Sequence, residues 1–210
     1  RLPDELDDLT GTLVEPLACA LRAVEHANVT IGSRVLILGA GPIGLLALAA
    51  ARRAGASIVV SADVNPARLS VARAWGATHA VNPQHDDLVA ILHHLTGQLG
   101  CDSAIDAVGL PVTRRQTVEA VRPGGRAIFL GLHQDETAIA GNLIVRSEIT
   151  VQGSYCYGQA DFSTALRLLQ EDFLPAAASW LTVRPLAEAN ASFAQLIDAP
   201  GDITKVILRP

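Results

Sequence analysis

The chain has 210 residues, of which 50% are hydrophobic and 18% are charged, and its formal net charge is −5. This composition indicates a globular chain with a well-buried core. The acidic balance argues against a nucleic-acid partner, which would require a basic face. The three cysteines, Cys19, Cys101 and Cys156, lie far apart without metal-ligand spacing. They therefore predict no disulfide framework and a reducing, cytoplasmic setting.

No membrane partner is expected. The apolar stretch from Val35 to Ala51 could be mistaken for a membrane span, but Gly39-Ala40-Gly41-Pro42 at its centre would break a spanning helix. A buried strand, a turn and a buried helix explain the stretch better. The acidic opening, Arg1 to Thr10, has no apolar run of the kind that a secretory signal contains.

Strands and helices are expected to alternate along most of the chain. Residues 1–13 are interpreted as a connection, followed by a helix from Glu15-Pro16 to about Asn28. Short apolar runs predict strands over residues 35–38, 58–60, 79–81, 103–107, 127–130 and 149–152. Helices are expected over residues 41–54, 65–76 and 86–96 and from Pro111, with a turn at Pro123-Gly124-Gly125. This order predicts an α/β fold: a doubly wound, mostly parallel six-stranded Rossmann sheet with helices on both faces.

The alternation ends after about Ser154. A helix capped by Asp161, a helix over residues 186–197 and a terminal strand over residues 205–208 are expected there. This tail is expected to pack outside the main sheet.

A glycine-rich turn joins the first expected strand to the next helix. Its sequence, Gly39-Ala40-Gly41-Pro42-Ile43-Gly44, is a G-x-G-x-x-G in the strand–turn–helix context that a dinucleotide site requires. Gly39 permits the tight turn, Gly41 lets the backbone approach a pyrophosphate, and Gly44 lets the helix pack closely on the strand. The pyrophosphate would lie at the helix N-terminus. A glycine-rich turn without a ligand is the less favoured alternative.

Asp63 follows the second expected strand, about twenty residues after the glycine turn. A carboxylate there accepts hydrogen bonds from the adenosine ribose hydroxyls and repels a 2′-phosphate, so it predicts NAD rather than NADP. The alternatives are a solvated acid at the strand end and a helix cap. Arg68, on the following helix rather than beside Asp63, is expected to stack near the adenine or to pair with surface acids.

Several further motifs occur in one order along the chain. They are Glu15-Pro16-Leu17-Ala18, Gly32-Ser33-Arg34-Val35, Gly76-Ala77, Ile105-Asp106-Ala107-Val108-Gly109, Pro123-Gly124-Gly125-Arg126, Gly153-Ser154-Tyr155 and the closing residues 205–210. With the glycine turn and Asp63 they resemble the cofactor-binding part of the zinc-type medium-chain dehydrogenases/reductases, the alcohol dehydrogenase superfamily, in its sorbitol- and threonine-dehydrogenase-like branch. Nothing resembles the catalytic domain that precedes this part in that family, so the chain is interpreted as a fragment.

The resemblance implies a division into three parts. Residues 1–30 would be a junction segment and helix leading to the absent catalytic domain, and residues 31–155 would be the NAD-binding Rossmann domain. Residues 156–210 would pack back on the domain junction. The sixth strand and the segment 132–146 resemble the edge through which the family forms dimers, so a homo-oligomer, either a dimer or a tetramer, is expected.

The resemblance also implies further site residues. Val108, Gly109, Gly131 and Leu132 would pass under the nicotinamide, and Ser154 and Tyr155 would hold its carboxamide through backbone groups. Glu15 would approach the catalytic zinc as a ligand or through its water, although a helix-end acid is an equal alternative. Cys19 is interpreted as a small core residue. Zinc is expected in the full-length enzyme rather than in this chain alone, which is expected to be inactive by itself.

The function predicted from the sequence is that of an NAD-dependent oxidoreductase. A hydride would pass between NAD and the secondary alcohol group of a small alcohol or polyol. One alternative is a zinc-free quinone or enoyl reductase, which usually has a basic residue where Asp63 stands. Another is a methyltransferase, which Gly44 and the tail argue against. The third is an NAD-binding module without activity of its own.

Overall fold

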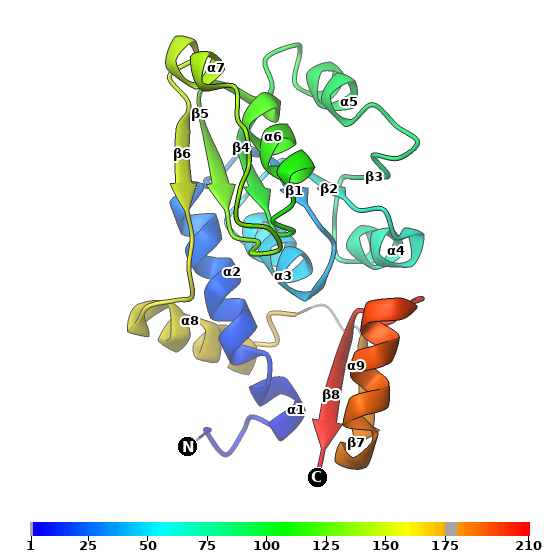
Figure 1. Ribbon diagram of the computed structural model, residues 1–210. Coiled ribbons are helices and arrows are strands. Elements are labelled where there is room, and N and C mark those ends of the chain that lie inside the picture. Colours follow the sequence, from blue (N-terminus) through cyan, green and yellow to red (C-terminus); the bar gives the residue numbers. More distant parts are fainter. Residues whose placement is uncertain (1, 175–179) are drawn as a thin grey trace.

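The computed structural model describes residues 2–174 and 180–210, and it contains a six-stranded sheet at its centre (Figure 1). All neighbouring strands in this sheet are parallel, in the order β3-β2-β1-β4-β5-β6. The strands are β1 (Arg34–Leu38), β2 (Ile58–Ala62), β3 (His79–Val81), β4 (Cys101–Asp106), β5 (Val121–Phe129) and β6 (Thr150–Gly153). The predicted six-stranded parallel sheet is therefore confirmed.

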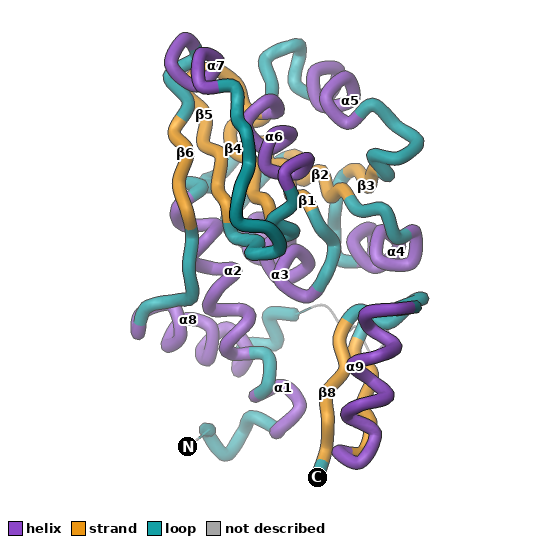
Figure 2. Tube along the Cα trace, in the orientation of Figure 1, coloured by secondary structure: helices purple, strands orange, loops and turns teal. Residues whose placement is uncertain are grey.

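Helices cover both faces of this sheet, as a doubly wound fold requires (Figure 2). One apolar cluster joins the sheet to α2 (Val14–His26), α3 (Pro42–Arg53), α4 (Pro66–Ala74) and α8 (Gln159–Gln170). The other cluster joins the opposite face to α5 (Leu88–Leu95) and α6 (Pro111–Ala120). Both faces are thus buried, which explains why the strand sequences are apolar at consecutive positions.

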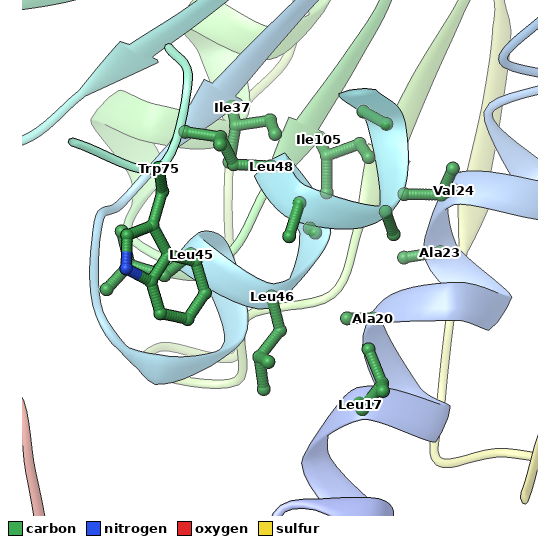
Figure 3. Close-up of a cluster of buried hydrophobic side chains, with 14 of the residues drawn as sticks. Leu17, Ala20, Ala23, Val24, Ile37, Leu45, Leu46, Leu48, Trp75 and Ile105 are labelled. Carbon is green, nitrogen blue, oxygen red and sulfur yellow. The ribbon is translucent and has the colours of Figure 1, made fainter. Parts of the chain in front are cut away.

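β1 illustrates how this sequence produces two buried faces. Val35 and Ile37 belong to the cluster on one face, and Leu36 and Leu38 belong to the cluster on the other. Successive side chains of a strand point to opposite faces, so four consecutive apolar residues fill both layers. On the first face, the small side chains of α2 let that helix lie close to α3 (Figure 3).

Several local features differ from the expectations. Residues 1–13 are not merely a connection, because Asp7 accepts the backbone N–H of Thr10 at 2.7 Å and starts the short helix α1 (Asp8–Gly11). Arg1 lies outside the described residues. The expected turn at residues 123–125 is a bulge inside β5, where the ladder shifts between Cys101 and Ser103. A further helix, α7 (Gly141–Arg146), was not expected.

The C-terminal residues form a separate small unit. In it, β7 (Leu181–Pro185) pairs in parallel with β8 (Lys205–Arg209). Only β8 was predicted. The last helix, expected over residues 186–197, divides into a 3-10 turn (Leu186–Glu188) and α9 (Ala189–Asp198). We call residues 180–210 the C-terminal unit.

The start of α8 also differs from the prediction. Gly158 is the residue that caps the helix. Asp161 lies in the first turn, where its Oδ2 accepts the N–H of Gly158 at 2.7 Å and pairs with Arg22 of α2 at 3.2 Å. Within the described ranges, we find no helix with the length and apolar character needed to cross a membrane.

A cluster of charges joins the amino ends of β1, β4 and β5. Asp102 of β4 pairs through Oδ2 with Nε of Arg34 at 3.1 Å and through Oδ1 with Nε of Arg122 at 2.7 Å. Burial raises the pKa of Asp102, but the hydrogen bonds from the two arginines outweigh it and hold this pKa well below its usual range. The Arg122 contact also holds the bulged segment of β5 to Asp102 of β4.

We expect Asp102→Asn to lower the free energy of unfolding by about 1–3 kcal/mol at pH 7, the usual contribution of hydrogen bonds to a charged group. Because the pKa of Asp102 is lower in the folded state, its carboxylate stabilises the fold at pH values above its unfolded-state pKa of about 4. This stabilisation is lost as the pH falls toward the folded-state pKa. The difference between wild type and variant should therefore shrink from pH 5 to pH 3 in urea unfolding. Glu119→Gln, at an exposed position of α6, is the control. A difference that is constant with pH would contradict the ion-pair account.

Candidate functional site

The glycine turn connects β1 to α3 at the carboxyl edge of the sheet. Gly39 has a φ of +94°, which favours glycine. A Cβ on Gly44 would overlap the carbonyl oxygen of Gly39, so only glycine lets α3 start this close to β1. Gly41 is the N-cap and supplies no side-chain hydrogen bond, so Ile43 and Gly44 start a helix whose first N–H groups lack intrahelical partners. No atom outside the adjacent residues lies within 4 Å of a Cβ built on Gly41. The turn thus combines open space with the N-terminus of a long helix, where an anion is favoured.

Asp63 is directly hydrogen-bonded to this turn. Its Oδ2 accepts the N–H of Ala40 at 2.7 Å, and its Oδ1 accepts the N–H of Asn65 at 2.8 Å. The half-buried carboxylate therefore has a defined orientation, and each oxygen keeps a further lone pair for a hydroxyl.

A cavity of about 370 Å³ opens beside Asp63. Arg68 lines the same cavity, and its buried Nε has no hydrogen-bond partner within the described part of the chain. Asp63 and Arg68 therefore line one cavity, although they lie on different elements. The Nε of Arg68 does not pair with a surface acid. The cavity is lined by Leu38, Gly39, Ala62, Asp63, Val64, Arg68, Pro83, Gln84, Val108, Leu110, Val112, Thr113 and Gln116.

A second cavity, of about 330 Å³, lies on the other side of Val108. It is lined by Cys19, Ile43, Ala107, Val108, Leu130, Gly131, Leu132, Ser154, Tyr155 and Cys156. Val108 lines both cavities, and Gly39 and Ile43 of the glycine turn line one each. The structure therefore brings most of the candidate residues together in two cavities beside the glycine turn, at the edge where open parallel sheets bind ligands. Glu15, Gly41, Pro42, Gly44 and Gly109 line neither cavity.

The loops after β4 and β5 touch through two glycines. A Cβ on Gly109 or on Gly131 would overlap the backbone of the other loop, so side chains at these positions would separate the loops. Asp106 is fully buried at the end of β4, and its Oδ1 accepts the N–H groups of Val108 and Gly109 at 2.9 and 3.0 Å. It therefore shapes the loop that carries Val108.

Arg114 of α6 fixes the second of these loops. Its guanidinium donates to the carbonyl of Gly131 and to Oγ1 of Thr137, both at 3.2 Å, and lies 4.0 Å from Oδ2 of Asp106. Sequence reasoning did not identify Asp106 or Arg114 as functional. The available signal for Asp106 was an acid at the end of an otherwise apolar strand.

Ser154 and Tyr155 differ in their surroundings. The N–H of Ser154 donates to the carbonyl of Phe129 at 2.8 Å, so this one backbone donor is already used within the protein. The buried Oγ of Ser154 has no partner among the described residues. Tyr155 and Leu132 are 74% and 77% exposed, so their side chains form the open rim of the second cavity.

Glu15 lies in the first turn of α2, one turn before Cys19. The Sγ of Cys19 donates to Oε1 of Glu15 at 3.4 Å. Partial burial and this hydrogen bond raise the pKa of Cys19 to about 12. Cys19 was expected in the core, but it is only half-buried and lines the second cavity. α2 thus delivers an exposed carboxylate to the neighbourhood of that cavity.

No group of three or more His, Cys, Asp or Glu side chains within residues 2–174 and 180–210 could hold a metal ion. The described residues therefore do not fit a zinc site by themselves, and no step through a metal is derived from them. They do fit a dinucleotide, since the absence of a side chain on Gly41 leaves space for a pyrophosphate at the N-terminus of α3.

Comparison with known proteins gives consistent matches. The zinc-binding dehydrogenase family model matches residues 42–171. The chain is 32% identical over 203 residues to D-xylulose reductase of Saccharomyces cerevisiae, covering 95% of this chain and 55% of that protein. The chain thus spans about half the length of this curated relative.

Solved structures agree with this match. The 2R,3R-butanediol dehydrogenase of Bacillus subtilis is 33% identical with a TM-score of 0.89, covering all of this chain and 60% of that one. A Sinorhizobium meliloti protein, bound to NADP, is 30% identical with a TM-score of 0.90, covering all of this chain and 61% of that one.

We expect Gly41→Val to abolish dinucleotide binding while the protein remains folded. Valine would meet no other part of the protein, but it would occupy the space that a pyrophosphate needs. Calorimetric titration with NADH and a thermal melt measure the two effects. Gly141→Val, at another glycine with open surroundings, is the control. Normal NADH affinity in a folded Gly41→Val protein would show that phosphates bind elsewhere.

Proposed function

Because the chain belongs to the zinc-binding dehydrogenase family, we propose that it is the cofactor-binding part of an NAD-dependent alcohol or polyol dehydrogenase that acts on a secondary alcohol. The observation that carries this proposal is the pair of cavities on either side of the glycine turn, one containing Asp63 and the other lying over the ends of β4 and β5. Relatives named for D-xylulose, sorbitol and butanediol support a small hydroxylated substrate.

The first cavity is proposed to hold the adenosine. Asp63 would accept the two ribose hydroxyls, since its orientation is fixed by the N–H groups of Ala40 and Asn65. Leu110 and Val112 supply apolar surface for the adenine. Arg68 would stack near the base. Its unpartnered Nε would also attract a 2′-phosphate, which favours NADP. The proposed preference for NAD therefore depends on the negative charge of Asp63, which repels that phosphate.

The second cavity is proposed to hold the nicotinamide. Gly109 and Gly131 let the two loops meet under the ring, and Val108 and Leu132 supply apolar contacts. The hydroxyl of Ser154 and the backbone of Tyr155 would serve the carboxamide, since the N–H of Ser154 already donates to Phe129. When bound, NAD accepts a hydride from the alcohol carbon. The residues of this chain orient the ring and exclude water from one of its faces.

Two parts of the chain are proposed to serve the complete protein. α1 and α2 would connect to the part that the relatives contain beyond this match, and Glu15 would there reach the catalytic zinc or its water. The C-terminal unit would pack against the same part, since Phe193 and Ile197 are 63% and 78% exposed. These two side chains lie one turn apart on α9, and adjoining exposed apolar side chains, unlike single ones, indicate an interaction surface.

A homo-oligomer is proposed to form through β6. This strand lies at the edge of the sheet, where one side of its backbone has no strand partner. Nearby, Val145 of α7 is 76% exposed.

We expect the protein to bind NADH more tightly than NADPH, and Asp63→Asn to reduce this preference. Removing the charge should weaken NADH binding about 10-fold or more, the equivalent of one to two hydrogen bonds to a charged group, while NADPH binding is retained or improved. Fluorescence titration with both cofactors measures the ratio. Asp198→Asn, on α9, is the control. If wild type binds NADPH equally well or better, the assignment of Asp63 is wrong.

In the complete protein, we expect Glu15→Gln to lower kcat for a polyol by about 10- to 100-fold, the usual effect of changing a group that supports a metal ligand. The affinity for NADH should not change, because Glu15 serves the metal side of the site. Glu25→Gln, an exposed acid on the same helix, is the control. Unchanged turnover would reduce Glu15 to an acid that stabilises the N-terminus of α2.

A further inference from the structure

Asn65 contacts both the proposed ribose site and the C-terminal unit. Its N–H donates to Oδ1 of Asp63 at 2.8 Å. Its Oδ1 accepts the N–H groups of Ala67 and Arg68 at 2.9 and 3.3 Å, which caps α4. Its Nδ2 donates to the carbonyl of Gly201 at 2.7 Å, across 136 positions of the sequence. Capping α4 requires only the side-chain oxygen, so the amide nitrogen has a separate role.

These contacts form a continuous path of hydrogen bonds. It leads from Gly201 to Asn65, from Asn65 to Asp63, and from Oδ2 of Asp63 to the N–H of Ala40 in the glycine turn. The orientation of the Asp63 carboxylate therefore depends on the position of Asn65 as well as on the turn. A displacement of Asn65 would rotate or release the carboxylate on one side.

The C-terminal unit holds α4 at its other end too. Trp75, which follows the last residue of α4, packs edge-to-face against Trp180 with ring centroids 5.0 Å apart. Trp75 and Trp180 are both buried. α4 is thus fixed at both ends by residues 180–210, and it carries Arg68 into the adenosine-side cavity. Figure 1 shows the C-terminal unit below α4 in that view.

We propose that Asn65 is a positioning residue through which the C-terminal unit sets the cofactor preference, by aligning Asp63 and the start of α4 for a ribose diol. This inference rests on the proposed function, in which Asp63 binds the ribose. Holding the carboxylate in place favours a diol, which needs two directed hydrogen bonds, over a phosphate, which responds mainly to charge. The C-terminal unit is therefore part of the cofactor site, although none of its residues lines either cavity described above.

The test is Asn65→Ser in the complete protein. Serine caps a helix as well as asparagine does, but its side chain is too short to donate to Gly201. Asn142→Ser, at an exposed position of α7, makes the same chemical change outside the C-terminal unit and is the matched control. Kd values for NADH and NADPH are measured by fluorescence titration, together with KM for NAD, kcat and the melting temperature.

We expect the Kd for NADH to rise about fivefold in Asn65→Ser, as the loss of one neutral hydrogen bond predicts, while the Kd for NADPH stays the same. KM for NAD should rise in parallel and kcat at saturating NAD should be retained. A merely structural role would weaken both cofactors equally, and this result or an unchanged ratio overturns the proposal. Asn65→Thr, which also retains a cap, replaces the serine variant if that fails to fold. If wild type itself shows no preference for NADH, the role of Asp63 fails first, and the inference fails with it.

Discussion

The close contact between Gly44 and the carbonyl of Gly39 is the constraint on which the rest of the site depends. It lets α3 start against the end of β1, with no room for a Cβ between them. Seven consecutive leucine and alanine residues of α3, 45–51, are then buried in the core, while the helix begins beside the open space above Gly41. Folding and anion binding thus use the same contact, since burying the apolar face of α3 also aims its N-terminus at the ligand.

The two halves of the cofactor site are built differently around this contact. The polar groups of the proposed adenosine half are close in sequence to the first two strands: Ala40 follows β1, Asp63 and Asn65 follow β2, and Arg68 lies on α4. The proposed nicotinamide half draws on α2, on the loops after β4 and β5 and on the residues after β6. Hydrogen bonds and an ion pair of Asp106 and Arg114 hold the loops after β4 and β5 together at the end of the sheet.

This difference explains how much the sequence could predict. The six strands, the glycine turn and Asp63 were predictable because each has a local signal: a buried apolar run, a glycine spacing, or an acid at a strand end. The β5 bulge was not, because it appears only when β5 pairs with β4, whose Asp102 contacts Arg122 across twenty positions of the sequence. β7 was missed since its partner, β8, lies beyond α9 and its own residues are only partly buried. The contact of Asn65 with Gly201 has no local signal at all, because asparagine before proline at a helix start is already explained by capping.

A carboxylate that selects a diol must be fixed before the cofactor arrives, since ordering it on binding would reduce the affinity gained. In this fold the N–H groups of Ala40 and Asn65 restrain the two oxygens of Asp63 from opposite sides. The first restraint comes from the core through the Gly39–Gly44 contact, and the second comes from α4, whose two ends the C-terminal unit holds. The apolar surface of that unit, including Phe193 and Ile197, is exposed in this chain. If this surface is covered in the complete protein, as proposed above, the contact would reach Asp63 through the second restraint, so the proposed ribose site would respond to domain packing more directly than the glycine turn.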